Sequence, residues 1–184
     1  SKPITVKTSG KLKSVTMTNE VGVEVKEKLS KDAKTWSTAE DLGYNHTYSI
    51  VASDVDGNKK KLSFSTPQAA GVAEVSLTPI PDSEVGVGQV IGVNFGVPIT
   101  DRKAAEKTIT VTTNPEVKGA FYWVNNQEVR WRPKEYWEPG TKVEVKVDQY
   151  GKDLGGGIYG GENAKTNFTI GDRTVAIIDN ATKT

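Results

Sequence analysis

The chain has 184 residues, and its 24 Lys and Arg against 23 Asp and Glu leave a formal net charge of +1. That length suits one large domain or two small ones, and the balanced charge argues against a nucleic-acid-binding protein. The sequence has no cysteine and one histidine, His46. This excludes disulfides, thiolate or multi-histidine metal sites and a cysteine nucleophile, so we expect no metal and no cofactor. No apolar stretch is long enough to span a membrane.

Short segments of alternating apolar and polar residues recur along the chain, as is typical of antiparallel strands with one wet face. The clearest are residues 4–7, 48–52, 62–65, 143–147 and 167–170. Only 101–107 predicts a helix, because Asp101 can cap it and alanines follow. Many short strands separated by turn residues predict an all-β protein built of β-sandwiches.

The sequence contains an internal repeat. When Trp36 is placed over Trp131, Thr18-Asn19 falls on Thr113-Asn114 and Tyr48 falls on Val143 at the same spacing. Two further matches are Phe64 with Phe168, and Ile4 and Val6 with Ile91 and Val93. The two halves therefore predict a tandem pair of similar sandwiches.

The repeat divides the chain into a first domain, residues 1–70, a second domain, residues 71–172, and a connector, residues 173–184. The short linker between the domains allows only limited independent motion. The second copy has gained the short helix, a Gly-rich loop at 151–161 and a segment at 75–88 that should contain its first strand. Because the first copy has no counterpart of that segment, we expect the first domain to lack its N-terminal strand.

Three motifs have a structural interpretation that outweighs the functional one. Gly155, Gly157 and Gly160 match a dinucleotide-binding spacing, but no helix follows them, so we expect a flexible hairpin loop. Residues 54–58 resemble a calcium loop that lacks its closing acidic ligand, which favours a β-turn. We expect His46 to be an exposed turn residue, because no neighbouring serine suggests a proton relay.

Aromatic and arginine residues alternate between 121 and 137. Strand parity places Trp123 and Trp131 on an inward face, and Trp137 fits the core and the surface equally well. The remaining members should point outward and could form an interaction surface: Tyr122, Arg130, Arg132 and Tyr136.

The C-terminal segment 173–179 is apolar and strand-like, although it follows the expected end of the second sandwich. Val175 and Ile177 share one face, and exposed β-branched residues on a free strand favour pairing. We expect this segment to form an interdomain junction; the alternative is an ordinary last strand of the second sandwich.

The ordered motifs of the second copy carry a specific resemblance. They include Val85–Gln89, Asp101–Lys107, Val111–Pro115, Gly119–Pro133, Trp137–Thr141, Tyr150–Gly155 and Phe168–Asp172. Together they resemble the N-terminal immunoglobulin-like (Ig-like) region of actinobacterial L,D-transpeptidases, and the resemblance extends through the first copy at 42–48. It implies two tandem Ig-like sandwiches.

The same resemblance implies envelope enzymes that form 3→3 peptidoglycan cross-links with a separate Cys/His catalytic domain. No residue here matches that catalytic motif, so the chain itself should not be an enzyme. The resemblance implies an extracytoplasmic spacer whose partner is its own C-terminal catalytic domain, attached to the membrane only through an anchor outside this chain. The alternative is a module that binds peptidoglycan or another partner through the exposed aromatic and arginine residues.

Overall fold

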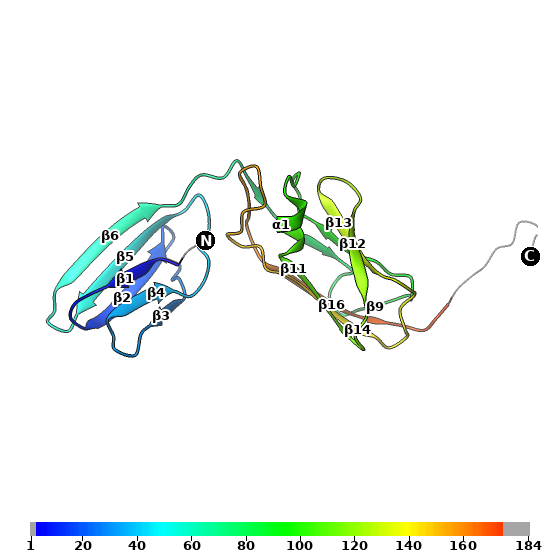
Figure 1. Ribbon diagram of the computed structural model, residues 1–184, viewed down its shortest axis with the longest axis horizontal. Helices are drawn as coiled ribbons and strands as arrows, with labels where there is room; N and C mark the ends of the chain where they lie inside the picture. The colour runs from blue at the N-terminus through cyan, green and yellow to red at the C-terminus, as the bar shows by residue number, and fades with distance from the viewer. Residues whose placement is uncertain (1–2, 175–184) are drawn as a thin grey trace, which may run out of the picture. The chain divides into compact units, whose positions relative to one another are not determined.

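The computed structural model describes residues 3–174, and its architecture is all-β, as the sequence predicts (Figure 1). By its contacts the chain divides into two units. The first comprises Ser1–Val72 with Gln149–Glu162, and the second comprises Ala73–Asp148 with Asn163–Thr184. Each unit contains two small β-sheets that enclose a core of its own.

The sandwich of the first unit has six strands. One sheet has the order β1-β4-β3 and the other the order β2-β5-β6, with every neighbouring pair antiparallel. Their bounds are β1 (Thr5–Lys7), β2 (Leu12–Asn19), β3 (Glu27–Leu29), β4 (Thr35–Thr38), β5 (Thr47–Asp54) and β6 (Lys59–Ser65).

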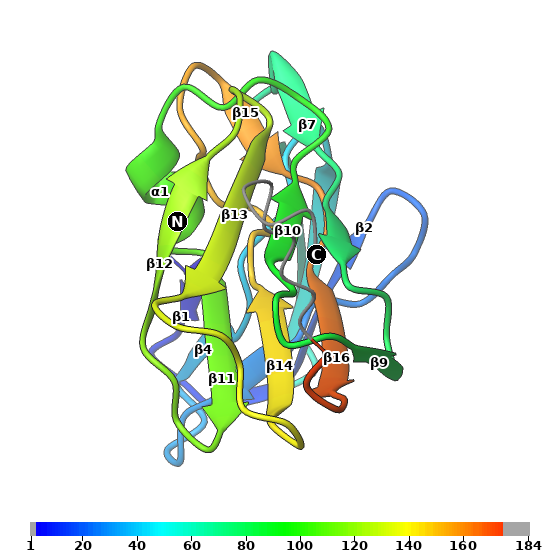
Figure 2. The ribbon, with the colours of Figure 1, turned by 90° about the vertical axis from the view of Figure 1, so that its right-hand side faces the viewer.

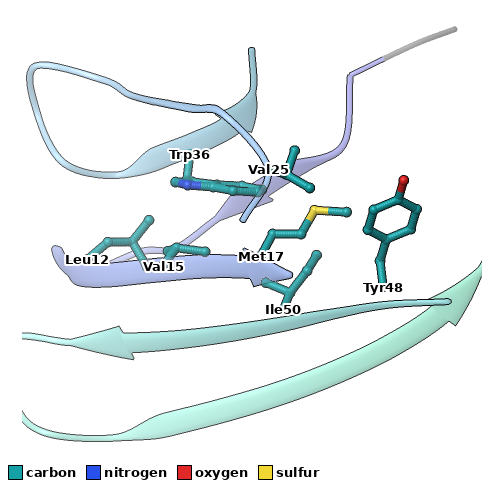
Figure 3. Packing of buried hydrophobic residues seen from close by; sticks show 7 residues of the cluster. All are labelled: Leu12, Val15, Met17, Val25, Trp36, Tyr48 and Ile50. Carbon is teal, nitrogen blue, oxygen red and sulfur yellow. The ribbon is translucent and has the colours of Figure 1, made fainter. Parts of the chain in front are cut away.

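Buried side chains of both sheets meet between the layers of the first unit (Figure 3). Trp36 of β4 lies against Met17 of β2 and Ile50 of β5, and all three are at most 3% exposed. Tyr48 lies at one end of this cluster. Its hydroxyl accepts a hydrogen bond of 3.0 Å from the backbone N–H of Gly43, and burial raises its pKa to about 12. This hydrogen bond is the tyrosine corner of Ig-like sandwiches, and Tyr48 lies at the start of β5, which takes the place of strand F in that fold.

The second unit has two four-stranded sheets, with the orders β12-β13-β10-β8 and β11-β14-β16-β9 (Figure 2). Their bounds are β8 (Ser76–Thr78), β9 (Ser83–Val85), β10 (Ile91–Asn94), β11 (Ile109–Asn114), β12 (Gly119–Trp123), β13 (Glu128–Pro133), β14 (Lys142–Val147) and β16 (Ala164–Ile170). The inward residues are almost fully buried, among them Val93, Val129, Val145 and Phe168.

The predicted helix is present as α1 (Arg102–Glu106). The Asp101 carboxylate caps it by accepting a hydrogen bond of 3.0 Å from the backbone N–H of Ala104. Ala105 is fully buried, and Glu106 accepts a hydrogen bond of 2.7 Å from the indole N–H of Trp123. The guanidinium of Arg102 also donates a hydrogen bond of 3.4 Å to the carbonyl of Asn125. The helix thus packs on the sandwich through one small side chain and through hydrogen bonds at Arg102 and Glu106.

The strand order of the two units confirms the repeat. The orders β2-β5-β6 and β11-β14-β16 correspond, as do β1-β4-β3 and β10-β13-β12. Tyr48 lies opposite Phe64, and Val143 lies opposite Phe168, so the alignment of these strands was right.

Two details of the alignment were wrong. Val6 lies opposite Trp36, whereas Ile91 lies opposite Trp131, so Val6 rather than Ile4 corresponds to Ile91. That error is a slip of two residues, which an alternating apolar pattern permits because it returns the same face inward.

The second error is a slip of one residue. Asn19 lies opposite Tyr48, but it is Thr113, and not Asn114, that lies opposite Val143. Matching the two Thr-Asn pairs therefore exchanged the inward and outward faces of these strands.

The extra segment of the second repeat forms two strands. β8 pairs antiparallel with β10, and β9 pairs parallel with β16. Beneath them Ile91 and Val93 are fully buried, whereas Val6 of β1 is only half-buried. Within residues 3–72 no strand takes the place of β8 or β9, so the outer edges of β1 and β6 are uncovered in that range.

The Gly-rich loop after β14 is ordered and belongs by its contacts to the first unit. It contains β15 (Ile158–Gly160), which pairs with β7 (Gly71–Ala73). The Tyr159 ring stacks on that of Tyr44 with 3.3 Å between centroids, and Lys152 forms an ion pair with Asp41. Gly151 has a φ of +68°, and a side chain there would collide with the carbonyl of Leu42.

Candidate interaction face of the second unit

The sheet β12-β13-β10-β8 has one face toward the core and one toward solvent, which we call the outward face. Val129 and Trp131 of β13 are 0% and 7% exposed, and Trp137 is 2% exposed. Trp123 is partly buried beneath Arg102, whose guanidinium lies 5.0 Å from the ring centroid. The parity prediction for Trp131 is confirmed, and Trp137 belongs to the core.

Tyr122 and Arg130 are cross-strand partners on the outward face. Tyr122 is 39% exposed, and the Arg130 Nε lies 2.7 Å from Oε1 of Glu128. The Glu128 carboxylate, together with a hydrogen bond involving the Tyr122 hydroxyl, raises the pKa of Arg130. Arg130 therefore has its charge compensated within the protein and is less available to a ligand than the sequence suggests.

A shallow groove of about 370 Å³ lies beside Arg130 on the same face. Polar side chains from four segments line it: Ser76, Thr78, Gln89, Asn94, Glu128 and Arg130. Gly92 lies among them, and even a methyl group there would come no closer than 3.7 Å to Thr78. We call this the polar groove.

A second groove of about 300 Å³ adjoins the polar groove through Gln89 and Val90. We call it the basic groove; it is lined by Val87, Gly88, Gln89, Val90, Arg132, Pro133, Lys134, Glu135 and Tyr136. A third depression, lined by Ala120, Phe121, Tyr122 and Arg132, meets the basic groove at Arg132. All four predicted surface residues thus line one continuous series of depressions.

Tyr136 is the most exposed aromatic residue of this face, at 59%. The next residue, Trp137, holds it in place, because the Trp137 backbone N–H donates to the carbonyl of Val87 at 2.9 Å. The indole N–H of Trp137 donates to the carbonyl of Gln89 at 2.7 Å. The guanidinium of Arg173 lies 5.8 Å from the centroid of the Tyr136 ring.

Sequence reasoning missed Lys134 and Gln89, which line the basic groove. Lys134 follows Arg130 and Arg132 at the same spacing of two residues, so strand parity alone is enough to predict that it lies on the outward face. Gln89 precedes β10 in a segment without alternation, and only the tertiary structure places it beside Arg132.

The other sequence candidates have structural roles or lie outside the described residues. Asp54 Oδ1 accepts hydrogen bonds from the backbone N–H groups of Asp56 and Asn58, which confirms a turn there. His46 is a partly exposed residue just before β5, with its Nδ1 2.6 Å from Oε1 of Glu20. The loop containing Gly155 leads into β15 and then β16 with no helix, as expected of a loop.

The predicted junction residues Val175 and Ile177 lie outside the described residues. Within 3–174, no group of three or more His, Cys, Asp and Glu side chains is arranged to hold a metal ion. No helix in that range is long and apolar enough to cross a membrane.

Comparison with known proteins identifies the family of this sandwich pair. The model of the bacterial Ig domain family matches residues 1–153. The chain belongs to this family. Its Ig-like sandwiches are similar in sequence to L,D-transpeptidase 2 of Mycobacterium tuberculosis, at 46% identity over 95% of this chain and 43% of that protein. L,D-transpeptidase 5 of the same species is 32% identical over 94% of this chain and 40% of its own length.

A solved structure of an L,D-transpeptidase in complex with imipenem is also similar, with 34% identity and a TM-score of 0.45. The match covers 54% of this chain and 40% of that one. The Ig-like chain described here spans less than half the length of the relatives it matches. The resemblance that the sequence motifs carry, to the Ig-like region of L,D-transpeptidases, is confirmed by these relatives.

Proposed function

We propose that the two Ig-like units form a non-catalytic spacer that positions the catalytic domain of a cell-wall L,D-transpeptidase outside the cytoplasm. The observation that carries this proposal is the match to such enzymes over 95% of the chain but only 43% of the relative's length. The catalytic partner would follow residue 184, and its product would be 3→3 cross-linked peptidoglycan. A membrane anchor outside this chain would tether the whole protein.

The chemistry of the chain supports a non-catalytic role. It has no cysteine, and its single histidine contacts Glu20 on the surface of the first unit. Covalent acyl transfer needs an activated nucleophile beside a base. The imidazole of His46 hydrogen-bonds with the Glu20 carboxylate at 2.6 Å, and the Thr66 hydroxyl bonds to the backbone of His46 rather than to its ring. Incubation with imipenem should therefore leave the intact mass of the chain unchanged, and a stoichiometric adduct would contradict the proposal.

The spacer role is tested in the full-length enzyme that contains this region. Three forms are compared: the native protein, one lacking residues 1–172, and one in which an unrelated pair of Ig-like domains replaces them. We expect deletion to reduce 3→3 cross-links in cells while activity on a soluble substrate is retained, and the unrelated pair to restore the cross-links. Full cross-linking by the deleted form would refute the spacer role.

The outward face favours a second candidate function, binding to the wall or to another partner. Its supporting observation is that Tyr122, Arg130, Arg132 and Tyr136 line one continuous series of depressions. If the unrelated Ig pair fails to restore cross-links, this second function gains support. A direct test of this binding function is to measure retention of the chain on insoluble peptidoglycan, which the Arg132→Ala variant should lose.

A further inference from the structure

The basic groove carries positive charge that the protein itself leaves uncompensated. Arg132 and Lys134 both line it and are both exposed. Among residues 3–174 neither has a carboxylate within ion-pair distance, whereas Arg130, Lys146 and Lys165 all do. An exposed guanidinium beside an ammonium is suited to a carboxylate, which can accept two parallel hydrogen bonds from arginine.

One acidic side chain, Glu135, also lines the basic groove, and its negative charge disfavours binding of an anion. It does not form an ion pair with Arg132 or Lys134 within the described residues. The guanidinium of Arg173 lies over Tyr136 at the same groove and adds a third positive charge. The balance of charge therefore favours a ligand with carboxylates.

The walls of the basic groove are held in position before any ligand arrives. The two hydrogen bonds from Trp137 to the carbonyls of Val87 and Gln89 join its two sides. Gly88 leaves room beside the Tyr136 ring, since an added Cβ there would lie 3.7 Å from it, at ordinary van der Waals distance. A preformed site loses little conformational freedom on binding, which favours affinity even when the contacts are few.

We propose that the basic groove binds an acidic peptide in an extended conformation, with one carboxylate between Arg132 and Lys134. The depression beside Tyr122 meets the groove at Arg132, so a peptide can continue along the sheet past that residue. A sugar ring fits less well, because the guanidinium of Arg173 already lies over the Tyr136 ring on which the sugar would stack. The proposal rests on the binding candidate above and is independent of the spacer role.

The test is a titration of the isotope-labelled 184-residue chain, followed by amide NMR. The probe is the peptide acetyl-Ala-Glu-Ala-Glu-Ala-amide, with the Gln-for-Glu peptide as the neutral comparison. We expect saturable shifts at residues 87–90 and 132–136 with the acidic peptide only, weakened by about 0.5 M salt. The double variant Arg132→Gln with Lys134→Gln should bind about fivefold to tenfold more weakly.

The matched control is Lys142→Gln, which removes the same kind of charge from an exposed position of β14 in the other sheet. It should leave the affinity unchanged. Equal weakening by Lys142→Gln, equal shifts with the neutral peptide, or no saturable shift at about 10 mM peptide would each overturn the proposal. Binding of a carboxylated oligosaccharide in place of the peptide would also overturn it. None of these results bears on the cross-linking assay, so failure of the groove and failure of the spacer are distinguishable.

Discussion

Replacing Tyr48 by Phe removes one hydroxyl from the core of the first unit and keeps the aromatic ring. The ring is 2% exposed and stacks on Phe64 with 5.8 Å between centroids, a contact that Phe retains. The hydroxyl accepts the backbone N–H of Gly43, which loses this partner in the variant. An unsatisfied buried donor costs about 1–3 kcal/mol, so we expect the first unit to lose about 2 kcal/mol of unfolding free energy.

The loss should be confined to the first unit. Urea titration followed by hydrogen exchange reports each unit separately, through peptides from β5 and from β14. For a unit of this size, about 2 kcal/mol corresponds to a fall of roughly 10 °C in its midpoint temperature. Tyr122→Phe is the control, because its hydroxyl lies on the partly exposed outward face and its loss should cost less than about 0.5 kcal/mol.

The same substitution has a signature at high pH. Because the folded pKa of Tyr48 is raised to about 12, the wild-type first unit is stabilised below the unfolded value near 10 and loses that stability as pH rises through 12. The Tyr48→Phe variant should not show this loss of stability at high pH. A loss below about 0.5 kcal/mol, or equal destabilisation of both units, would refute the role given to the hydroxyl.

Three further predictions concern other local contacts. Asp101→Ala should lower the stability of the second unit by about 1 kcal/mol in urea titration, with Asp101→Asn close to wild type, since Asn also caps. Thr166 is 1% exposed and its hydroxyl donates a hydrogen bond to the carbonyl of Pro79, so Thr166→Val should lower the stability of the second unit by about 1–2 kcal/mol. Leu62 occupies the matching position of β6 and is 60% exposed, so Leu62→Ser should lower the stability of the first unit by less than about 0.5 kcal/mol. Equal losses would contradict the finding that this edge is covered in the second unit and uncovered in the first. The hydrogen bond with His46 lowers the pKa of Glu20, so this contact stabilises the first unit above pH 4.5 and its contribution is lost as pH falls through the lower folded pKa. Urea midpoints should accordingly fall less on acidification in Glu20→Gln than in wild type, and identical pH profiles would exclude the contribution.

Much of the candidate face followed from strand parity. Alternation between 128 and 133 is enough to send Val129 and Trp131 inward and Arg130 and Arg132 outward, because successive side chains of a strand point to opposite faces. Strand parity could not show which of the two arginines has a carboxylate partner. Only the folded sheet shows that Glu128 engages Arg130, and that Arg132 with Lys134 forms the uncompensated pair.

The sequence by itself determined the all-β class, the tandem repeat, the capped helix at Asp101 and the absence of a cysteine nucleophile. Each of these depends on residue type or on a period of two, which are local properties. Strand register was decided by the tertiary structure, because a slip of two residues preserves the apolar face and leaves no trace in the alternation. The tertiary structure likewise placed the Gly-rich loop with the first unit, through contacts between residues far apart in the chain such as Tyr44 and Tyr159.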